Sequence, residues 1–187
     1  RGKMTAEMSE GFHFRDQDYA VAGIHGQPPF DPARLGLHPV GTCTGCWRGY
    51  VATFALLGDQ LVLERLAINL GRFQEDQEFL QAIGPRINGV EPLIPVTPYP
   101  LFNNTYQAVN LPLDFSGGLL IARDFIQELY VHMGFHPAWK YREVWELIFA
   151  GGKLTSAEDV SPRVAILRKK MARKPLIPRW REKDRLK

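Results

Sequence analysis

Cysteine is scarce in this chain, since Cys43 and Cys46 are the only two among 187 residues. Two cysteines cannot form the dense disulfide framework of a small secreted domain, so a reducing compartment is expected. The sequence also lacks a run of about 20 apolar residues and an apolar N-terminal signal segment. We therefore expect a soluble protein without membrane insertion, in the cytoplasm or in an organelle matrix after removal of a targeting peptide.

The composition is that of an ordinary folded domain. Apolar residues make up 45% of the chain and charged residues 23%, which is enough apolar surface to form a core without help from disulfides or a structural metal. We expect a single domain with appendages and no cofactor.

Charge is distributed unevenly along the chain. Residues 163–187 contain eleven Lys or Arg against Glu182 and Asp184, whereas the whole chain has 23 basic and 20 acidic residues. The part before residue 163 therefore holds twelve basic and eighteen acidic residues. A cationic tail on an acidic body needs an anionic partner, or must lie against its own body. This asymmetry indicates attachment to a partner rather than catalysis.

A β-hairpin is predicted over residues 47–70. Aromatic and β-branched residues alternate from 47 to 57, Gly58 and Asp59 supply a tight turn, and a second alternating stretch runs from 61 to 70. We expect the two strands to pair antiparallel, with Phe54 and Leu63 removed from water.

The remaining segments give weaker signals. Residues 1–40 are rich in turn formers and are predicted to be an irregular N-terminal arm. The other expectations are a helix over 73–83, a proline-rich surface crossing up to 100 and a second hairpin from 106–115 and 119–123. We also expect a helix within 122–135, where a strand fits almost as well, a helix over 137–150 and a last helix over 161–174. Together they predict an α+β fold, an antiparallel sheet of two hairpins with flanking helices, in which 41–160 is the core domain and 161–187 the basic C-terminal helix and tail.

One set of residues has the spacing of metal ligands. Asp124, Glu128, His132 and His136 recur at intervals of four, so their side chains share a face in a helix and in a strand alike. Imidazole and carboxylate groups are ligands for zinc and other divalent ions. A solvated polar face is the simpler interpretation, and Glu128, His132 and His136 stay an alternative metal site.

Cys43 and Cys46 form a CxxC pair, which in redox proteins lies at a helix N-terminus. Here a strand follows and a second cysteine pair is missing. His38 is near enough in sequence to join a three-ligand metal site, but a turn before the strand explains the residues more simply.

Arg48 lies in an otherwise apolar stretch. A buried arginine needs an anionic or carbonyl partner, and two remain open. One is an anion such as a nucleotide, which would make the protein a small enzyme. The other is an internal ion pair with a body carboxylate, which we favour.

The tail carries the functional hypothesis. We expect a non-enzymatic interaction module, or an accessory subunit of a larger assembly, that docks through the tail onto nucleic acid, RNA above all, or onto an acidic protein surface. A small enzyme is the alternative. The residues expected to contact the partner are Arg168, Lys169, Lys170, Arg173, Lys174, Arg179, Trp180 and Arg181.

Overall fold

The computed structural model describes residues 6–75, 78–97, 100–132 and 134–172. One large sheet contains β1 (Gly11–Phe14), β2 (Gln17–His25), β3 (Tyr50–Leu57), β4 (Gln60–Ile68), β7 (Asn104–Tyr106), β8 (Leu111–Pro112), β9 (Gly117–Phe125), β10 (Tyr141–Ala150) and β11 (Lys153–Asp159). A small hairpin consists of β5 (Gly71–Phe73) and β6 (Phe79–Gln81), and the helix α1 spans Ser161–Ala172. The fold is therefore mostly β rather than α+β.

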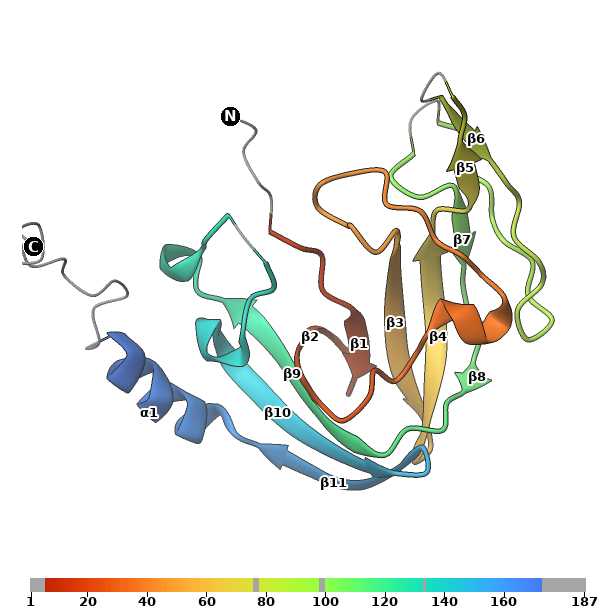
Figure 1. Cartoon of the computed structure of the whole chain (residues 1–187). Helices are drawn as coiled ribbons and strands as arrows, with labels where there is room; N and C mark the ends of the chain where they lie inside the picture. Colours follow the sequence, from red (N-terminus) through yellow and green to blue (C-terminus); the bar gives the residue numbers. More distant parts are fainter. Residues whose placement is uncertain (1–5, 76–77, 98–99, 133, 173–187) are drawn as a thin grey trace, which may run out of the picture.

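The large sheet is mixed and curls back on itself (Figure 1). Its strands follow the order β11-β10-β9-β2-β1-β3-β4-β7, and β8 pairs with β4 as well. The β1–β3 pair is parallel, and the other pairs are antiparallel. Lys153 of β11 pairs with Gln60 of β4, and the backbone N–H of Leu61 donates to the carbonyl of Gly152 at 2.8 Å. The last strand of the sheet thus meets β4 and closes the sheet at one end.

The main core lies inside this curled sheet. Its members are side chains that point inward from strands on both sides, together with residues of the connecting loops. The largest fully buried ones are Tyr106, Phe12, Phe54, Leu61, Leu63, Leu66, Ile68, Leu119, Ile121, Leu147 and Val109. A second, smaller cluster on the outer face includes Ala122, Ala138, Tyr141, Val144 and Val160. The strands β9 and β10 are therefore covered on both faces.

The predicted hairpin at 47–70 is confirmed. β3 and β4 pair antiparallel from Tyr50 opposite Ile68 to Leu57 opposite Gln60. Phe54 and Leu63 form a cross-strand pair and are 1% and 0% exposed. The alternating pattern and the Gly58 turn predicted this element correctly because both signals are local in sequence.

Two expectations for the N-terminal half are wrong. Residues 1–40 are not irregular throughout, because β1 and β2 form a hairpin within the large sheet. The segment 73–83 is not a helix, since Phe73 and Phe79–Gln81 belong to the strands of the β5–β6 hairpin, which pair Phe73 with Phe79. The described part of 82–103 contains only isolated β-bridges, in agreement with a proline-rich crossing.

Three expectations for the C-terminal half are wrong as well. Segments 106–115 and 119–123 do not pair with each other, because β7 and β8 pair with β4 while β9 lies between β2 and β10. The 122–135 segment is a strand up to Phe125 and then a short 3₁₀ turn. The 137–150 segment is mainly strand β10 rather than helix. β10 carries apolar residues on both faces because α1 covers its outer side, and this hides the alternation from which a strand is predicted.

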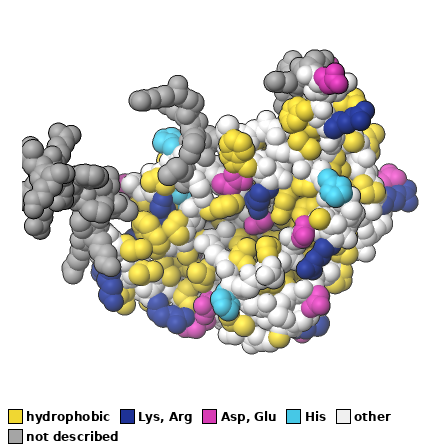
Figure 2. All heavy atoms as spheres, viewed as in Figure 1, with side chains coloured by type: hydrophobic (Ala, Val, Ile, Leu, Met, Phe, Trp, Pro, Cys, Tyr) yellow, Lys and Arg dark blue, Asp and Glu magenta, His cyan; other side chains and the backbone are white. Residues whose placement is uncertain are grey.

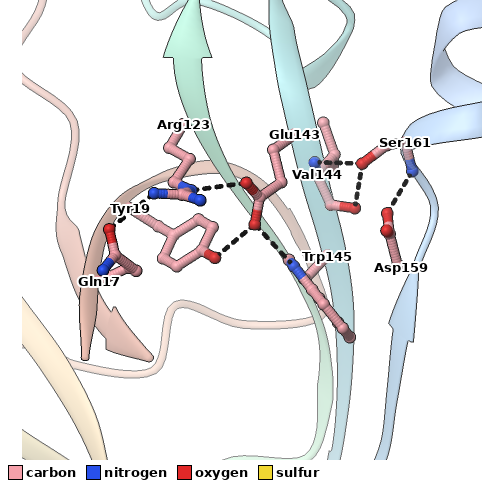
Figure 3. A network of polar contacts seen from close by, with 8 residues as sticks. All are labelled: Gln17, Tyr19, Arg123, Glu143, Val144, Trp145, Asp159 and Ser161. Carbon is pink, nitrogen blue, oxygen red and sulfur yellow. Dashed lines mark hydrogen bonds and ion pairs between the residues drawn. The ribbon is translucent and has the colours of Figure 1, made fainter. Parts of the chain in front are cut away.

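A carboxylate on β10 joins three strands near the β1–β2 turn (Figure 3). Glu143 Oε1 accepts hydrogen bonds from Tyr19 Oη at 2.6 Å and from Trp145 Nε1 at 3.1 Å, and its Oε2 accepts one from Arg123 Nε at 2.6 Å. Burial alone would raise the pKa of Glu143, but these hydrogen bonds hold it below its usual range. Burial and the Glu143 contact raise the pKa of Tyr19 to about 12. Arg123 also donates to Gln17 Oε1 at 2.7 Å.

We predict that sheet closure depends on Gly152. Its φ is +78°, and a Cβ there would lie 2.1 Å from the Leu113 carbonyl oxygen. Gly58 has a φ of +63° but open space around the same position. Urea unfolding should show that Gly58→Ala costs roughly 1–2 kcal/mol, the strain of a left-handed alanine alone, and that Gly152→Ala costs about 3–4 kcal/mol. Equal losses would contradict a close backbone approach at the closure.

A second prediction concerns the pH dependence of stability. Because the folded-state pKa of Glu143 is lowered, its contribution is fully present above the unfolded value near 4.5 and is lost as the pH falls through the folded value. Glu143→Gln should lower the free energy of unfolding by roughly 1–2 kcal/mol at neutral pH. The difference from wild type should shrink as the pH falls below about 4.5. Urea unfolding across the acid range tests this, with exposed Glu128→Gln as the control that should change little at any pH.

Candidate partner-binding surface

The helix α1 is attached firmly at its N-terminus. The backbone N–H of Ser161 donates to Asp159 Oδ1 at 2.9 Å, and Ser161 Oγ accepts from the backbone N–H of Val144 at 2.9 Å (Figure 3). The backbone N–H of Val160 donates to the Val144 carbonyl at 2.9 Å. The predicted start of the last helix at residue 161 is therefore confirmed, and this start is hydrogen-bonded to the backbone of β10.

A second anchor lies two turns further along the helix. Arg168 Nε donates to the Trp139 carbonyl at 2.7 Å, and its Nη2 donates to the carbonyl of Tyr141. Val164 packs against the outer cluster. The structure thus directs Arg168, which the sequence assigned to partner binding, toward the body of its own chain.

Several other side chains of α1 are exposed to solvent. Ile166, Leu167 and Met171 are 58%, 45% and 40% exposed, and Lys169 and Lys170 are exposed beside them. In Figure 1 the helix lies at the outer edge of the molecule, away from β3 and β4. A short surface therefore combines three large apolar side chains with two ammonium groups, and among the described residues neither Lys169 nor Lys170 forms an ion pair.

Arg163 belongs to the same cationic segment, although it is not one of the predicted partner-binding residues. Arg163, in the first turn of α1, lies 3.1 Å from Glu158 Oε2 and 3.8 Å from Glu146 Oε2, so its charge is compensated within the chain. The remaining predicted partner-binding residues lie outside the described residues, namely Arg173, Lys174, Arg179, Trp180 and Arg181.

Arg48 has internal partners. Its Nη1 is hydrogen-bonded to Glu10 Oε1, its Nη2 donates to the Met8 carbonyl at 2.8 Å, and its Nε lies 3.6 Å from Glu7 Oε1. The guanidinium also lies over the ring of Tyr50, 5.1 Å from its centroid. This is the internal ion pair that the sequence left open against an anion site, and it ties the N-terminal segment to the loop before β3.

Cys43 and Cys46 face each other across a tight turn. The backbone N–H of Cys46 donates to the Cys43 carbonyl at 3.3 Å, and both thiols are free. Cys46 is buried, its Sγ donates to the Tyr50 carbonyl at 3.2 Å, and burial raises its thiol pKa. A raised pKa disfavours the thiolate on which redox and metal-binding cysteines depend. Cys43 is partly exposed, and the nearby loop residue His38 is exposed.

Glu128, His132 and His136 lie in the loop between β9 and β10. Glu128 is exposed, whereas the ring centroids of His132 and His136 lie 4.8 and 5.2 Å from that of Tyr130. His136 Nδ1 lies 3.2 Å from the buried Lys140 Nζ, and burial together with this ammonium lowers the pKa of His136. In the described part of the chain, no three His, Cys, Asp or Glu side chains are grouped to hold a metal ion. His132 and His136 thus belong to an aromatic cluster around Tyr130.

Sequence reasoning missed the Glu143 network. Arg123 and Glu143 are charged residues at inward positions of β9 and β10, and they face each other in the paired register. Each residue alone resembles an ordinary surface charge in sequence. Only the pairing of the two strands could have identified them as partners.

Comparisons with protein-family models, with curated proteins and with solved structures found no match to this chain. Within the described residues, no helix is long and apolar enough to cross a membrane.

We predict that Arg168 holds the second half of α1 on the body. Its two hydrogen bonds to backbone carbonyls contribute about 1 kcal/mol each. Arg168→Ala should therefore speed amide exchange over residues 166–171 by roughly tenfold or more. Lys169→Ala removes an exposed cation from the same turn and should leave exchange unchanged. If both variants exchange like wild type, the helix is held without Arg168.

Proposed function

We propose that this protein is a non-enzymatic interaction module, an accessory subunit of a larger assembly, that binds an acidic protein surface through α1 and the cationic segment after it. The observation that carries the proposal is that α1 is fixed to the body and still exposes large apolar and cationic side chains. Ser161 and Arg168 fix the helix, and the exposed side chains lie between and beyond these anchors.

The chemistry of the free side supports a protein partner. Leu167 and Met171 offer exposed apolar surface that a groove on another protein would bury, and Lys169 and Lys170 would lie at the rim of that groove. Rim ammonium groups favour an acidic partner and speed the encounter with it. A phosphate backbone would pair with the lysines but would leave Leu167 and Met171 in water.

Nucleic acid, RNA above all, is the second candidate. The observation in its favour is the density of charge, eleven Lys or Arg in residues 163–187 with Trp180 among them. Such a segment neutralises phosphates and offers one aromatic ring for stacking on a base. The two enzymatic alternatives have less support, because Arg48 already has carboxylate partners and His136 lies in an aromatic cluster.

The test is photo-crosslinking in the cells that naturally make the protein. A photoreactive residue at Met171 should give a cross-linked product that nuclease does not shorten, whereas the same group at Leu57, which is 54% exposed at the β3–β4 turn, should give none. Lys169→Glu with Lys170→Glu should weaken partner binding about tenfold, since each rim charge contributes roughly 0.5–1 kcal/mol.

A second double variant controls for the change in net charge alone. Arg72→Glu with Arg86→Glu makes the same change in net charge in and near the β5–β6 hairpin and should leave the cross-link intact. A product that nuclease shortens would contradict the protein partner and support RNA. The logarithm of the RNA-binding constant should then fall with the logarithm of the salt concentration with a slope of about −4 for five phosphate contacts. Equal cross-linking from Met171 and Leu57 would contradict docking through α1 altogether.

A further inference from the structure

Cys43 and Cys46 lie in the loop that precedes β3, between residues 40 and 49. The two sides of this loop approach each other closely, because a Cβ on Gly41 would lie 2.4 Å from the Trp47 carbonyl oxygen. In Figure 1 the loop is drawn in orange at the top of the view, where it leads into β3. The backbone therefore holds the chain narrow around the two cysteines.

The turn brings the cysteines to a separation at which a disulfide can form. Cys43 and Cys46 form an isolated antiparallel bridge, in which the Cys46 backbone N–H donates to the Cys43 carbonyl at 3.3 Å. Residues opposite each other in such a bridge have Cα atoms about 4.5–5.5 Å apart and side chains on the same face. A disulfide requires a Cα separation of roughly 4.4–6.8 Å. The two sulfur atoms can therefore be joined without unfolding of the loop.

The two thiols differ in their access to solvent. Cys43 is partly exposed and lines a pocket of about 570 Å³, whose walls include the paired rings of Phe73 and Phe79 in the β5–β6 hairpin. This volume is in the range of small-molecule sites, roughly 300–1,000 Å³. Cys46 is 1% exposed, and its Sγ donates to the Tyr50 carbonyl. A small reagent can thus reach Cys43 but not Cys46.

The same turn holds the N-terminal segment. The Met8 backbone N–H donates at 2.8 Å to the carbonyl of Gly45, which lies between the two cysteines in sequence. Arg48 follows shortly after and pairs with Glu10. Figure 2, in the view of Figure 1, shows acidic and basic side chains next to one another on this face. A chemical change in the turn therefore affects a contact between two parts of the chain.

From this geometry we infer that Cys43 and Cys46 are a thiol–disulfide exchange site, which a small-molecule disulfide of the glutathione kind oxidises reversibly. The Cys43 thiolate attacks one sulfur of that disulfide, whose S–S bond breaks, and the first thiol leaves with the proton that Cys43 gave up. The Cys46 thiolate then attacks the Cys43 sulfur of the mixed disulfide and releases the second thiol. Two protein thiols are oxidised while one disulfide is reduced to two thiols. The site is independent of the partner proposed for α1.

The burial of Cys46 determines the order of the two steps. Burial raises the pKa of the Cys46 thiol, so few of these thiols are ionised at neutral pH and none is open to an external disulfide. Its attack depends instead on its fixed position beside Cys43. The second step should accelerate as the pH rises above neutral. Oxidation also removes the hydrogen that Cys46 Sγ donates to the carbonyl of Tyr50, the first residue of β3.

Mass spectrometry of the full folded chain in excess glutathione disulfide tests the site. Wild type should lose two hydrogen atoms and resist alkylation, and a reductant should reverse both changes. Cys46→Ser should stop at a glutathione adduct on Cys43. Cys43→Ser should form an adduct on buried Cys46 roughly tenfold more slowly or less. A wild-type chain that keeps both thiols, or that accumulates an adduct in place of the internal disulfide, would overturn the inference.

A second measurement separates the folded turn from mere closeness in sequence. A CxxC pair can also close in an unfolded chain, so the equilibrium with glutathione is measured in buffer and in urea. The effective concentration of one thiol at the other should be roughly tenfold higher or more in the folded chain. By linkage, the oxidised chain should resist urea unfolding by the same factor. Equal effective concentrations in the two states would show that the fold does not assemble the pair.

Discussion

Closure of the sheet is the constraint on which the rest of the structure depends. Lys153 of β11 pairs with Gln60 of β4, and the Leu61 and Leu154 backbone N–H groups donate to the Gly152 and Asp59 carbonyls, both at 2.8 Å. These contacts join the C-terminal strands to the β3–β4 hairpin and so create an enclosed interior. The interior buries apolar side chains from both sides, and that burial stabilises every strand that lines it.

Closure also explains how α1 is placed. Because β10 contributes Leu147 and Phe149 to the interior, its alternate residue Val144 faces outward and is covered by Val160 and Val164. The backbone of Val144 then fixes the start of the helix. One strand thus packs one face against the core and orients α1 with the other. The exposed side of α1 is consequently held in a defined direction.

Several residues with functional chemistry serve the structure instead. Arg48 ties the N-terminal segment to the loop before β3, Arg168 holds α1, and Glu143 joins three strands. In each case burial makes an unpaired polar group costly, so the fold supplies the partner. Exposed lysines and apolar side chains, by contrast, lie at the surface of α1.

Local signals allowed the sequence by itself to determine the hairpin around Gly58, the helix beginning at Ser161 and the excess of cations after residue 162. Alternation, a tight turn and a helix cap each act within a few residues, so they can be recognised in one segment. Only the tertiary structure decided that 137–150 is mainly a strand, because its two apolar faces fit a helix equally well until β9 and β11 pair with it. The same holds for the candidate sites. Which cations are free and which aromatic rings form a pocket depends on contacts between residues far apart in sequence.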